Sequence, residues 1–409
     1  MREGWKEVEL EELGTIGRGK SRHRPRNANF LYGNEYPFVQ TADVKAAEYK
    51  ITSYSQMYSE AGLAQSKLWP INTLCITIAA NIADSSILGI EACFPDSVVG
   101  FIADPLKSDV KFVKYLFDML QIRIKQISQG AAQDNLSLEK IRTLRFTVPN
   151  VETQRKIASI LSGYDDLIEN NLKRIKILEE MAQQTYEEWF VRMRFPGYDT
   201  TTGSVAVMNE ETSLPEGWEK VKLGDWIKTS SGGTQSKKKE VEFYQNGTIP
   251  WVRTGELKNF ILIDSEIKIT ASALKNSSAK LFPKETVLLA MYGNTIGETT
   301  YCDFETSTNQ ACCGFLVKNQ NESYFIHQYL LKNKEQVLSF RMGATQENIS
   351  QTIIQNMEVI KPNDELLNQF GLITKRFYDS IINLLNQNQR LRESRDILLP
   401  RLMMGMIEV

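Results

Sequence analysis

The sequence predicts a mixed α/β fold in which two similar globular domains are each followed by a long helix. Three observations carry this prediction. Segments of the first half recur at a constant offset, short apolar runs alternate with turn residues inside each copy, and an apolar heptad pattern follows each copy. The 409 residues are enough for two or three domains with cores of ordinary size.

The internal repeat keeps an offset of 213 residues from residue 4 to residue 149. GW (4–5) returns as GW (217–218), YPFVQTADVK (36–45) as IPWVRTGELK (249–258), and GAAQDNLS (130–137) as GATQENIS (343–350). This repeat indicates a duplicated domain, whatever the function of that domain. Within the copies, runs such as LCITIA and TVLLAMY predict strands, and VKFVKYLFDMLQIRI and YFIHQYLLKNKEQVLSF each predict a helix.

Apolar residues recur at alternating gaps of three and four after each copy, from Leu161 to Trp189 and from Phe377 to Leu402. This spacing is the a/d seam of a coiled coil. We expect the two stripes to pair with each other, and pairing with another chain is the alternative. Three polar residues interrupt the seam: Asn171, Asn388 and Arg395. An asparagine buried in a seam fixes the register of the helices, whereas one at its solvent edge has no such role.

These patterns divide the chain into five parts. Pro196-Gly197 and the Gly/Ser/Thr-rich stretch after it predict a linker. The predicted parts are a first domain (1–150), a first long helix (151–195), the linker (196–214), a second domain (215–362) and a second long helix (363–409).

The composition is that of an ordinary globular protein, with 42% hydrophobic and 24% charged residues. No apolar run approaches the roughly 20 residues that span a bilayer, and we expect no membrane association. Five cysteines without framework spacing indicate reduced thiols in a cytoplasmic protein. The formal net charge of −2 disfavours a purely electrostatic DNA-binding protein, so any contact with DNA must depend on local basic patches.

One motif suggests catalysis. GTIGRGKS, from Gly14 to Ser21, matches the phosphate-binding P-loop pattern of NTPases. A P-loop requires a helix that begins at its Lys-Ser pair, and Pro25 with its neighbouring arginines disfavours a helix there. The matching segment of the second copy (227–234) has no Gly-Lys pair. The chain has only two histidines and no C-x-x-C pair, so we predict neither a metal site nor any catalytic residue.

Basic loops at corresponding places of the two copies are the first candidates for DNA contact, because Arg and Lys bind phosphates and guanine edges. A solvated charged loop is the alternative. The candidate residues are Lys20, Arg22, Arg24 and Arg26 in the first copy, and Thr234, Lys237, Lys238 and Lys239 in the second.

Further candidates are polar residues at positions that the repeat matches. Gln40 and Arg253 follow the same aromatic-Val pair, and Gln can bind adenine bidentately where Arg binds guanine. A polar position that varies in a constant frame is what two different half-sites require. The remaining predicted contacts are Lys45, its match Lys258, and Asn294.

The G-A-x-Q-x-N-[LI]-S segments hold Gln133, Asn135, Gln346 and Asn348. Gly, Asn and Ser before an apolar-periodic stretch favour a turn and a helix N-cap, and DNA contact is the alternative.

With these features, the chain resembles the specificity subunit of type I restriction–modification systems over almost its full length. The likeness lies in the GW-x-x-V-x-L start of each copy, P-[FW]-V, LWPINTLCITIA with LFPKETVLLAMYGNTIG, the G-A-x-Q-x-N-[LI]-S segment, and a long helix with Gln154 near its start. The order of these motifs, repeated twice, is more specific than any one of them. The second helix departs from the pattern, with Leu367 at the place of Gln154 and with Gly371 nearby.

The resemblance implies two target-recognition domains that an antiparallel pair of helices holds apart, with a pseudo-two-fold relation between the copies. Each domain recognises one half of a bipartite site in double-stranded DNA, and the helices set the spacing between the halves. Two methylation subunits dock on the helices and two motor-nuclease subunits join them. S-adenosylmethionine, ATP and Mg are bound by those partners, so this chain holds no cofactor. The alternatives are an NTPase that uses Gly14–Ser21 and a coiled-coil scaffold that does not touch DNA.

Overall fold

The computed structural model describes residues 4–78, 83–127, 138–199, 204–205, 209, 213–234, 240–341 and 347–409. Two compact units are formed. The first consists of Met1–Glu169 with Gln389–Val409, and the second of Asn170–Asn388. Each unit contains one copy of the sequence repeat together with part of both long helices.

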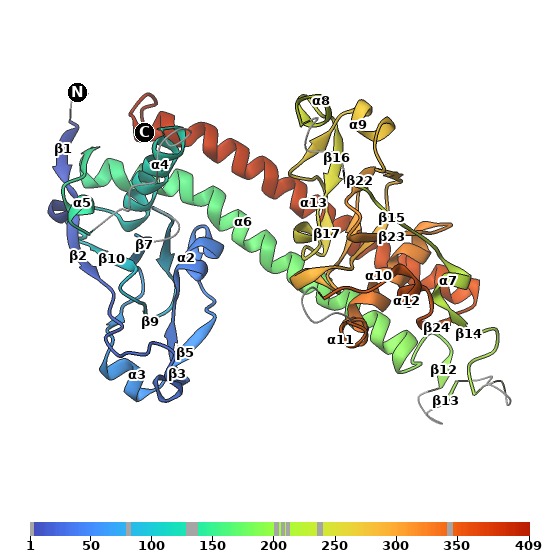
Figure 1. Cartoon of the computed structure of the whole chain (residues 1–409). Helices are drawn as coiled ribbons and strands as arrows, with labels where there is room; N and C mark the ends of the chain where they lie inside the picture. The colour runs from blue at the N-terminus through green and yellow to red at the C-terminus, as the bar shows by residue number, and fades with distance from the viewer. Residues whose placement is uncertain are drawn as a thin grey trace. The chain divides into compact units, whose positions relative to one another are not determined.

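The first unit is built on a five-stranded and a four-stranded sheet (Figure 1). The larger has the order β2 (Gly14–Arg18), β10 (Val98–Ala103), β7 (Leu74–Thr77), β8 (Ser85–Leu88) and β4 (Lys50–Ile51). The smaller has the order β5 (Gln56–Tyr58), β3 (Tyr32–Phe38), β9 (Ala92–Cys93) and β6 (Leu68–Trp69). A separate pair joins β1 (Lys6–Glu9) to β11 (Arg145–Val148). Its helical segments are α1 (Leu10–Leu13), η1 (Asn29–Leu31), α2 (Thr41–Ala47), α3 (Glu60–Ala64), α4 (Val110–Ile127) and α5 (Leu138–Arg142).

The second unit repeats both strand orders. Its larger sheet runs β15 (Lys228–Ser231), β23 (Cys312–Leu316), β20 (Val287–Ala290), β21 (Thr299–Cys302) and β17 (Ile261–Leu262). Its smaller sheet runs β18 (Lys268–Ile269), β16 (Ile249–Val252), β22 (Thr306–Thr308) and β19 (Leu281–Phe282), and β14 (Glu219–Lys222) pairs with β24 (Glu358–Lys361). The common topology confirms that the sequence repeat is a duplicated domain.

The helices of the second unit also follow the first. They are α7 (Leu223–Trp226), α8 (Glu240–Tyr244), η4 (Thr254–Glu256), α9 (Ala271–Lys275), η5 (Gly293–Thr295), α10 (Gln320–Lys332), α11 (Lys334–Ser339) and α12 (Gln351–Gln355). A short strand pair, β12 (Tyr198–Asp199) with β13 (Ser204–Val205), precedes them. The single helix predicted from YFIHQYLLKNKEQVLSF is in fact two, because α10 ends before Asn333 and α11 begins after it.

The same kind of helix N-cap occurs in both copies at a place where their sequences differ. Ser59 accepts a hydrogen bond from the Gly62 amide at 3.3 Å and begins α3. Thr270 accepts one from the Ala273 amide at 3.2 Å and begins α9. Hydroxyl side chains at this position satisfy amides that have no partner inside the helix. The start of this helix is therefore encoded locally in both copies.

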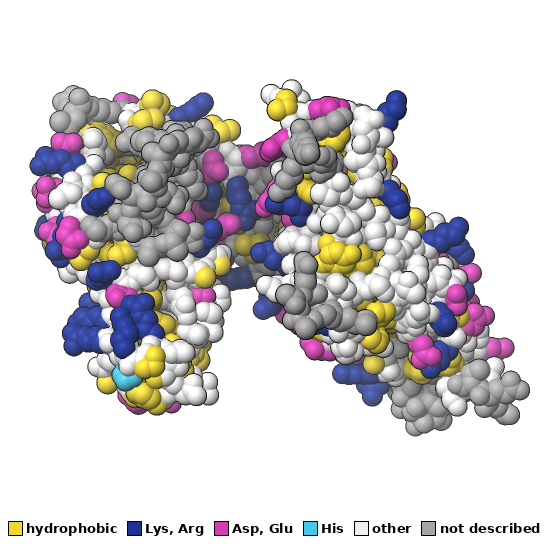
Figure 2. Space-filling view, in the orientation of Figure 1, with side chains coloured by type: hydrophobic (Ala, Val, Ile, Leu, Met, Phe, Trp, Pro, Cys, Tyr) yellow, Lys and Arg dark blue, Asp and Glu magenta, His cyan; other side chains and the backbone are white. Residues whose placement is uncertain are grey.

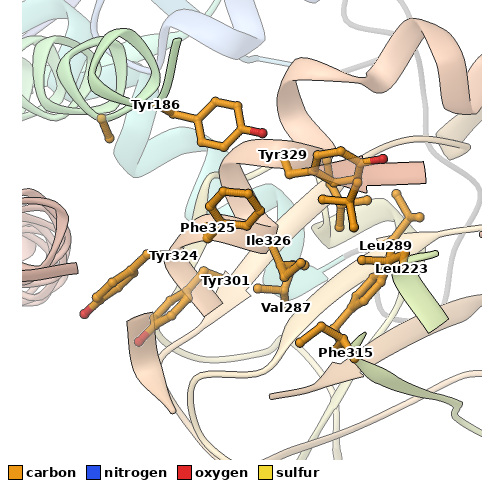
Figure 3. Packing of buried hydrophobic residues seen from close by; sticks show 14 of the residues in the cluster. Tyr186, Leu223, Val287, Leu289, Tyr301, Phe315, Tyr324, Phe325, Ile326 and Tyr329 are labelled. Atoms are coloured by element: carbon orange, nitrogen blue, oxygen red, sulfur yellow. The ribbon is translucent and has the colours of Figure 1, made fainter. Parts of the chain in front are cut away.

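The core of the second unit packs its sheet against α10 and the long helices. Figure 3 shows Tyr186 facing Phe325 and Tyr329 of α10, above Val287, Leu289 and Phe315 of the sheet. The rings of Tyr186 and Phe325 lie 5.4 Å apart in an edge-to-face arrangement, which aromatic pairs favour. Aromatic residues thus join the long helix to the domain that follows it.

The long helices are α6 (Val151–Tyr186), which continues as a π-helical turn at Glu187–Val191, and α13 (Asp364–Met403). They pair in antiparallel fashion: Asp165 meets Arg395 in the first unit, and Asn171 meets Asn388 in the second. The predicted seam is confirmed by the burial of Leu161, Ile168, Ile175, Ala182, Trp189, Ile381, Leu384 and Leu402. The two helices therefore form the expected intrachain coiled coil.

The two seam asparagines bond to each other. The Asn171 amide Nδ2 donates to Asn388 Oδ1 at 2.9 Å, and both residues are buried. The alternative of solvent-edge asparagines is therefore wrong.

Gln154 is also buried, and its side chain bonds to the chain around it. Its Oε1 accepts from the Asp109 amide at 3.2 Å, and its Nε2 donates to the carbonyls of Pro149 at 2.9 Å and Lys107 at 3.1 Å. Leu367, at the matching position, packs in the core of the second unit. This difference lies inside the two domains, so it does not distinguish their outer surfaces.

Candidate nucleic-acid interface

The P-loop match does not form a phosphate-binding loop. Gly14–Arg18 is strand β2, paired with β10 from Val99 to Ala103. Residues 19–28, all of them described, form a loop without helix, and η1 begins only at Asn29. The helix N-terminus that a P-loop needs is missing from this stretch. The structure therefore does not support the NTPase alternative.

The predicted basic loop of the first unit follows β2 and is anchored to the sheet. The Gly19 amide donates to the Val98 carbonyl at 2.9 Å, and the Lys20 amide to the Phe94 carbonyl at 3.1 Å. A Cβ on Gly19 would lie 2.3 Å from the Pro95 carbonyl oxygen, so a side chain there would collide with backbone. The loop therefore leaves the sheet at a point that only glycine permits.

The four predicted cations of this loop fall into two pairs. Arg26 Nη2 contacts both oxygens of Asp96, at 2.7 and 2.9 Å, and Arg24 Nη2 lies 4.0 Å from the same carboxylate. Lys20 and Arg22 are exposed, and neither side chain has a hydrogen-bond or ion-pair partner within the described part of the chain. The positive charge available to an anion is thus concentrated at Lys20 and Arg22. In Figure 2, Lys and Arg side chains gather on the part of the first unit just above the place where Figure 1 shows α3, level with β9.

Gln40 and Arg26 line one pocket of about 170 Å³, together with Tyr32, Thr41 and Ser97 among others. Gln40 begins α2, and its backbone amide donates to the Asp43 carboxylate at 2.8 Å. Its side-chain Nε2 donates to Gln56 Oε1 on the neighbouring strand β5. Arg26 and Gln40, which belong to different predicted groups of contacts, thus line the same pocket.

Arg253 occupies the same backbone position in the second unit. It begins η4, and its amide donates to the Glu256 carboxylate at 2.9 Å, as Gln40 does to Asp43. Its guanidinium Nη2 lies 2.7 Å from Glu266 Oε2. The two side chains therefore extend from one common frame and differ in chemistry.

The other predicted contacts are dispersed. Lys45 is exposed on α2 and lines a different pocket, of about 430 Å³, with Lys114, Asp118 and Arg392. Lys258 lies exposed after η4, and Asn294 is exposed within η5. In the second basic loop, exposed Thr234 donates from its hydroxyl to Gln310 Oε1.

Several predicted residues lie outside the described residues: Lys237, Lys238, Lys239, Gln133, Asn135 and Gln346. Asn348 is described and forms a β-bridge with Tyr292. Ser350 caps α12 by accepting from the Ile353 amide at 3.3 Å, as expected for the end of this segment.

Lys67 and Lys280 were missed by the sequence argument. Lys67 Nζ lies 3.5 Å from the centroid of the Trp69 ring, a cation–π contact. Lys280 Nζ lies 3.0 Å from Ser230 Oγ. Their signal was present in the repeat, since SKLWP (66–70) returns as AKLFP (279–283) at the same offset.

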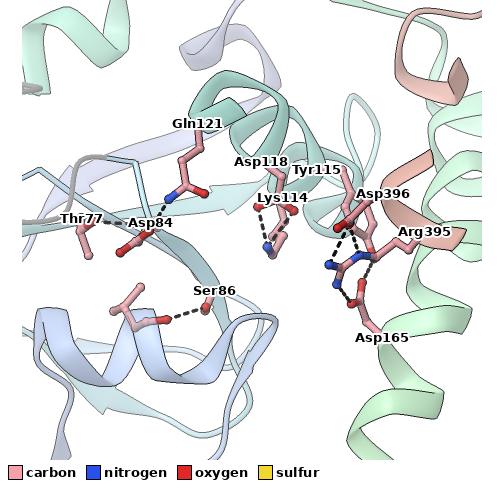
Figure 4. Close-up of polar contacts among 11 residues, drawn as sticks. Thr77, Asp84, Ser86, Lys114, Tyr115, Asp118, Gln121, Asp165, Arg395 and Asp396 are labelled. Atoms are coloured by element: carbon pink, nitrogen blue, oxygen red, sulfur yellow. Dashed lines mark hydrogen bonds and ion pairs between the residues drawn. The ribbon is translucent and has the colours of Figure 1, made fainter. Parts of the chain in front are cut away.

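A polar cluster in the first unit joins the domain to both long helices (Figure 4). Asp165 of α6 accepts from the Tyr115 hydroxyl and from the Arg395 guanidinium. Burial and the neighbouring Asp165 raise the pKa of Tyr115 above its usual value, so the phenol stays protonated and donates. Burial also raises the pKa of the Asp118 carboxyl, which Lys114 opposes at 2.7 Å. The bonds of Asp165 to Tyr115 and Arg395 hold the two long helices against α4, and the Lys114–Asp118 pair lies within α4 beside them.

The described residues do not show a metal or thiol centre. Within the ranges given above, no three His, Cys, Asp or Glu side chains are grouped to hold a metal ion. All five cysteines are free and buried, and burial raises the pKa of Cys75, Cys302, Cys312 and Cys313. A buried thiol with a raised pKa is unreactive. No helix in the described part of the chain is long and apolar enough to cross a membrane.

Known proteins match this chain in both copies. Residues 2–180 and 215–391 match the family described as type I restriction modification DNA specificity domain. The chain is 25% identical to the type I restriction enzyme MjaIX specificity subunit of Methanocaldococcus jannaschii, over 99% of this chain and 94% of that one. It is 22% identical to the HindI specificity subunit of Haemophilus influenzae, over 98% of this chain and 99% of that one.

A solved structure is similar along the same length. The S subunit of a type I restriction–modification system from M. genitalium aligns with a TM-score of 0.56 and 16% identity, covering 97% of this chain and 96% of that chain. This likeness concerns the fold. Together with the family match, which covers most of the chain in two segments, it identifies the duplicated architecture. The chain belongs to the family of type I restriction–modification DNA specificity subunits.

Proposed function

We propose that this chain is the non-catalytic DNA-recognition subunit of a type I restriction–modification complex, in which each domain recognises one half of a bipartite site. The observation that carries the proposal is the common frame of Gln40 and Arg253. Both residues begin a short helix, both bond through the backbone amide to an acidic side chain three residues later, and only their side chains differ. Two half-sites of different sequence need such an arrangement.

The chemistry of the two side chains suggests which bases they recognise. The Gln amide pairs bidentately with adenine, and the Arg guanidinium with guanine. Both groups now bond to neighbours, Gln56 and Glu266. The Arg253–Glu266 pair is exposed, and exposed ion pairs contribute at most about 1 kcal/mol, so DNA can replace it at little cost. In the first domain, Arg26 lines the Gln40 pocket and is the natural phosphate or base contact beside it.

We assign DNA contact to the same residues that the sequence predicts, but these residues are not equally available to DNA. Lys20 and Arg22 are free to bind phosphate, whereas Arg24 and Arg26 must first exchange Asp96 for DNA. In the second domain the assigned contacts are Arg253, Lys258, Asn294, Thr234 and the three lysines 237–239. Lys45 lies on the same helix as the Gln40 cap and is kept as a contact on that ground.

The proposal divides the chain into target-recognition domains (1–150 and 215–362), long helices (151–195 and 363–409) and a linker (196–214). We infer that two methylation subunits dock on the helices and that two motor-nuclease subunits complete the complex. S-adenosylmethionine, ATP and Mg act in those partners. The proposed location is the cytoplasm, in keeping with five cysteines that are free thiols.

Methylation mapping of the host genome tests the proposal. Deletion of this chain should abolish a bipartite methylated motif, and reintroduction should restore it. Gln40→Ala should relax discrimination at one position of one half by about 1–3 kcal/mol, and Arg253→Ala should do the same in the other half. Each variant is the control for the other. A methylation pattern that is unchanged by the deletion would refute the proposed function.

A further inference from the structure

Each unit carries a lysine at the same position of the repeat, directly before a short strand. Lys67 precedes β6 and Lys280 precedes β19, and their numbers differ by 213 (280 − 67). Both lysines are exposed. Both copies therefore carry a positive charge at this position, whereas the position of Gln40 and Arg253 carries a different side chain in each copy.

Buried aromatic residues hold the two lysines in place. Trp69 is buried against the larger sheet of the first unit, where a Cβ on Gly100 would lie 2.7 Å from its ring. Phe282 is buried in the same way against Gly314, where a Cβ would lie 2.5 Å from its ring. Glycine in the second strand of the larger sheet, β10 or β23, makes room for the ring in both units. The backbone of each lysine, two residues before the aromatic residue, is thereby anchored to the sheet.

Lys67 shares its surroundings with another cation. The Ser66 hydroxyl donates to the Lys20 carbonyl at 2.8 Å, which joins the two segments. Partial burial and the charge of Lys20 both lower the pKa of Lys67. Neither lysine is paired with an acid in the part of the chain that the structure describes. Two like charges held together without an acid repel each other, and a bound anion relieves that repulsion.

Lys280 is placed by the same packing. Its Nζ lies 3.0 Å from the hydroxyl of Ser230 on β15. Gly233 matches Lys20 (20 + 213) and packs on Ser278, where a Cβ would lie 2.3 Å from the Ser278 carbonyl carbon. In both units, the segment before the lysine therefore lies against the chain that leaves the first strand of the larger sheet. That chain is the predicted basic loop.

We propose that Lys67 and Lys280 are equivalent contacts to DNA phosphates, one in each domain, which anchor the domain irrespective of the bases in its half-site. The inference rests on the proposed function and adds two residues to it. A lysine ammonium on an anchored backbone is a point charge suited to phosphate. Phosphate contacts position a protein on the duplex, and base contacts specify the sequence. A charge that both copies keep fits the first role, and the diverged pair Gln40 and Arg253 fits the second.

The test is the salt dependence of DNA binding, measured on the full chain purified with the subunits that accompany it. The probes are a duplex with the methylated motif and an unrelated duplex of equal length. Lys67→Gln and Lys280→Gln should each lower the slope of log K against log salt by about 0.9. They should weaken binding of both duplexes by the same factor and leave the methylated motif unchanged. Lys67→Arg should keep the slope.

Two matched controls come from the same units. Lys107 and Lys284 are exposed lysines, but each is paired with an aspartate, Asp104 at 3.2 Å and Asp303 at 3.0 Å. Their replacement by Gln should leave the slope unchanged. A melting temperature equal to that of the wild type shows that the change in slope comes from the lost charge and not from a loss of the fold.

The outcomes separate the inference from the proposed function. A wild-type slope in Lys67→Gln and Lys280→Gln overturns the inference, and sequence-specific binding by these variants leaves the proposed function intact. Weaker binding of the cognate duplex alone also overturns the inference, because it identifies a base contact. Failure of the wild-type complex to bind either duplex refutes the proposed function, and the inference with it.

Discussion

Matched positions of the two units carry different polar groups. In the first unit, Asp165 accepts from Tyr115 and Arg395. The residues 213 positions away are Tyr378 for Asp165, Gln328 for Tyr115 and Ala182 for Arg395. There, Gln328 Nε2 donates to the Tyr378 hydroxyl at 3.0 Å. A charged layer in one copy is thus an uncharged one in the other, although the backbone frame is common.

Asp165→Ala is expected to destabilise the first unit by about 3 kcal/mol, because it leaves the Tyr115 hydroxyl without its acceptor and the Arg395 guanidinium with Asp396 alone. Asp165 is 3% exposed and Arg395 21%, so solvent compensates little. Urea unfolding of the full chain measures the change. Asp379→Ala is the control, since it breaks an exposed pair with Lys375 and should cost no more than about 1 kcal/mol.

Removal of Arg395 together with Asp165 tests whether the charge of Arg395 causes the loss of stability. The double variant Asp165→Ala/Arg395→Ala places alanine where the second unit has Ala182, and it should recover part of the stability lost in Asp165→Ala. If the double variant is less stable than the single one, an uncompensated charge is not the reason for the loss.

His327 gives the second unit a pH dependence. Burial lowers the pKa of His327 to about 3, although a hydrogen bond with the Thr299 backbone opposes the shift. The ring is therefore neutral, and its Nδ1 and the Tyr378 hydroxyl share a hydrogen bond of 2.6 Å. The unfolded chain, with a histidine pKa of 6.5, takes up a proton at higher pH than the folded one. Stability is thus complete above pH 6.5 and falls as the pH drops toward 3.

The slope of that fall should reach roughly 1 kcal/mol per pH unit. Urea unfolding at a series of pH values from 7 to 4 measures it. His327→Gln should remove this component, so that the difference in stability between wild type and variant shrinks as the pH falls. A difference that is constant over this range would contradict the assignment of a neutral, buried ring.

At the scale of single elements, the coiled coil shows how one polar layer differs from its symmetric counterpart. Asn171 faces Asn388. The offset of 213 converts this pair into Leu384 and Ile175 (171 + 213 and 388 − 213), both buried in the second unit. One layer of the seam is therefore polar and the related one apolar. Buried polar pairs in coiled coils fix register at a cost in stability.

The asparagine layer gives the third prediction. Asn171→Leu alone should cost about 1–3 kcal/mol, because it leaves the Asn388 carboxamide buried without its donor. Asn171→Leu/Asn388→Leu should raise the melting temperature above wild type, because it copies the apolar layer. Thermal melting followed by circular dichroism compares the three proteins. A double variant that melts below Asn171→Leu would show that the layer has no room for two leucines.

At the scale of the whole molecule, two features agree with recognition by two independent domains. Each unit has its own core and its own pair of sheets, with the same strand orders. The formal net charge of −2 means that attraction to DNA must come from local groups, for which we propose Lys20 and Arg22. A domain that carries its own contacts can be exchanged without changing the other.

Exchange of residues 215–362 for the second domain of another family member is the fourth prediction. It should change one half of the methylated motif and leave the other half as it is, because each half is recognised by residues of one domain. Exchange of residues 1–150 should alter the complementary half. Methylation sequencing measures both. A motif in which both halves change, or neither, would contradict separate recognition.

The sequence by itself determined the duplication, the strand and helix types and the helix seam, because these follow from local periodicity and from similarity along the chain. Tertiary structure alone decided which polar groups are free. Asp96 pairs with Arg24 and Arg26 from 72 and 70 residues away (96 − 24 and 96 − 26), and Gln154 is buried at the start of α6. It also placed Gln40 and Arg26 in one pocket, and it placed the segment that holds Lys67 against Lys20. Ion pairing and burial depend on neighbours that are distant in sequence, and no local pattern records them.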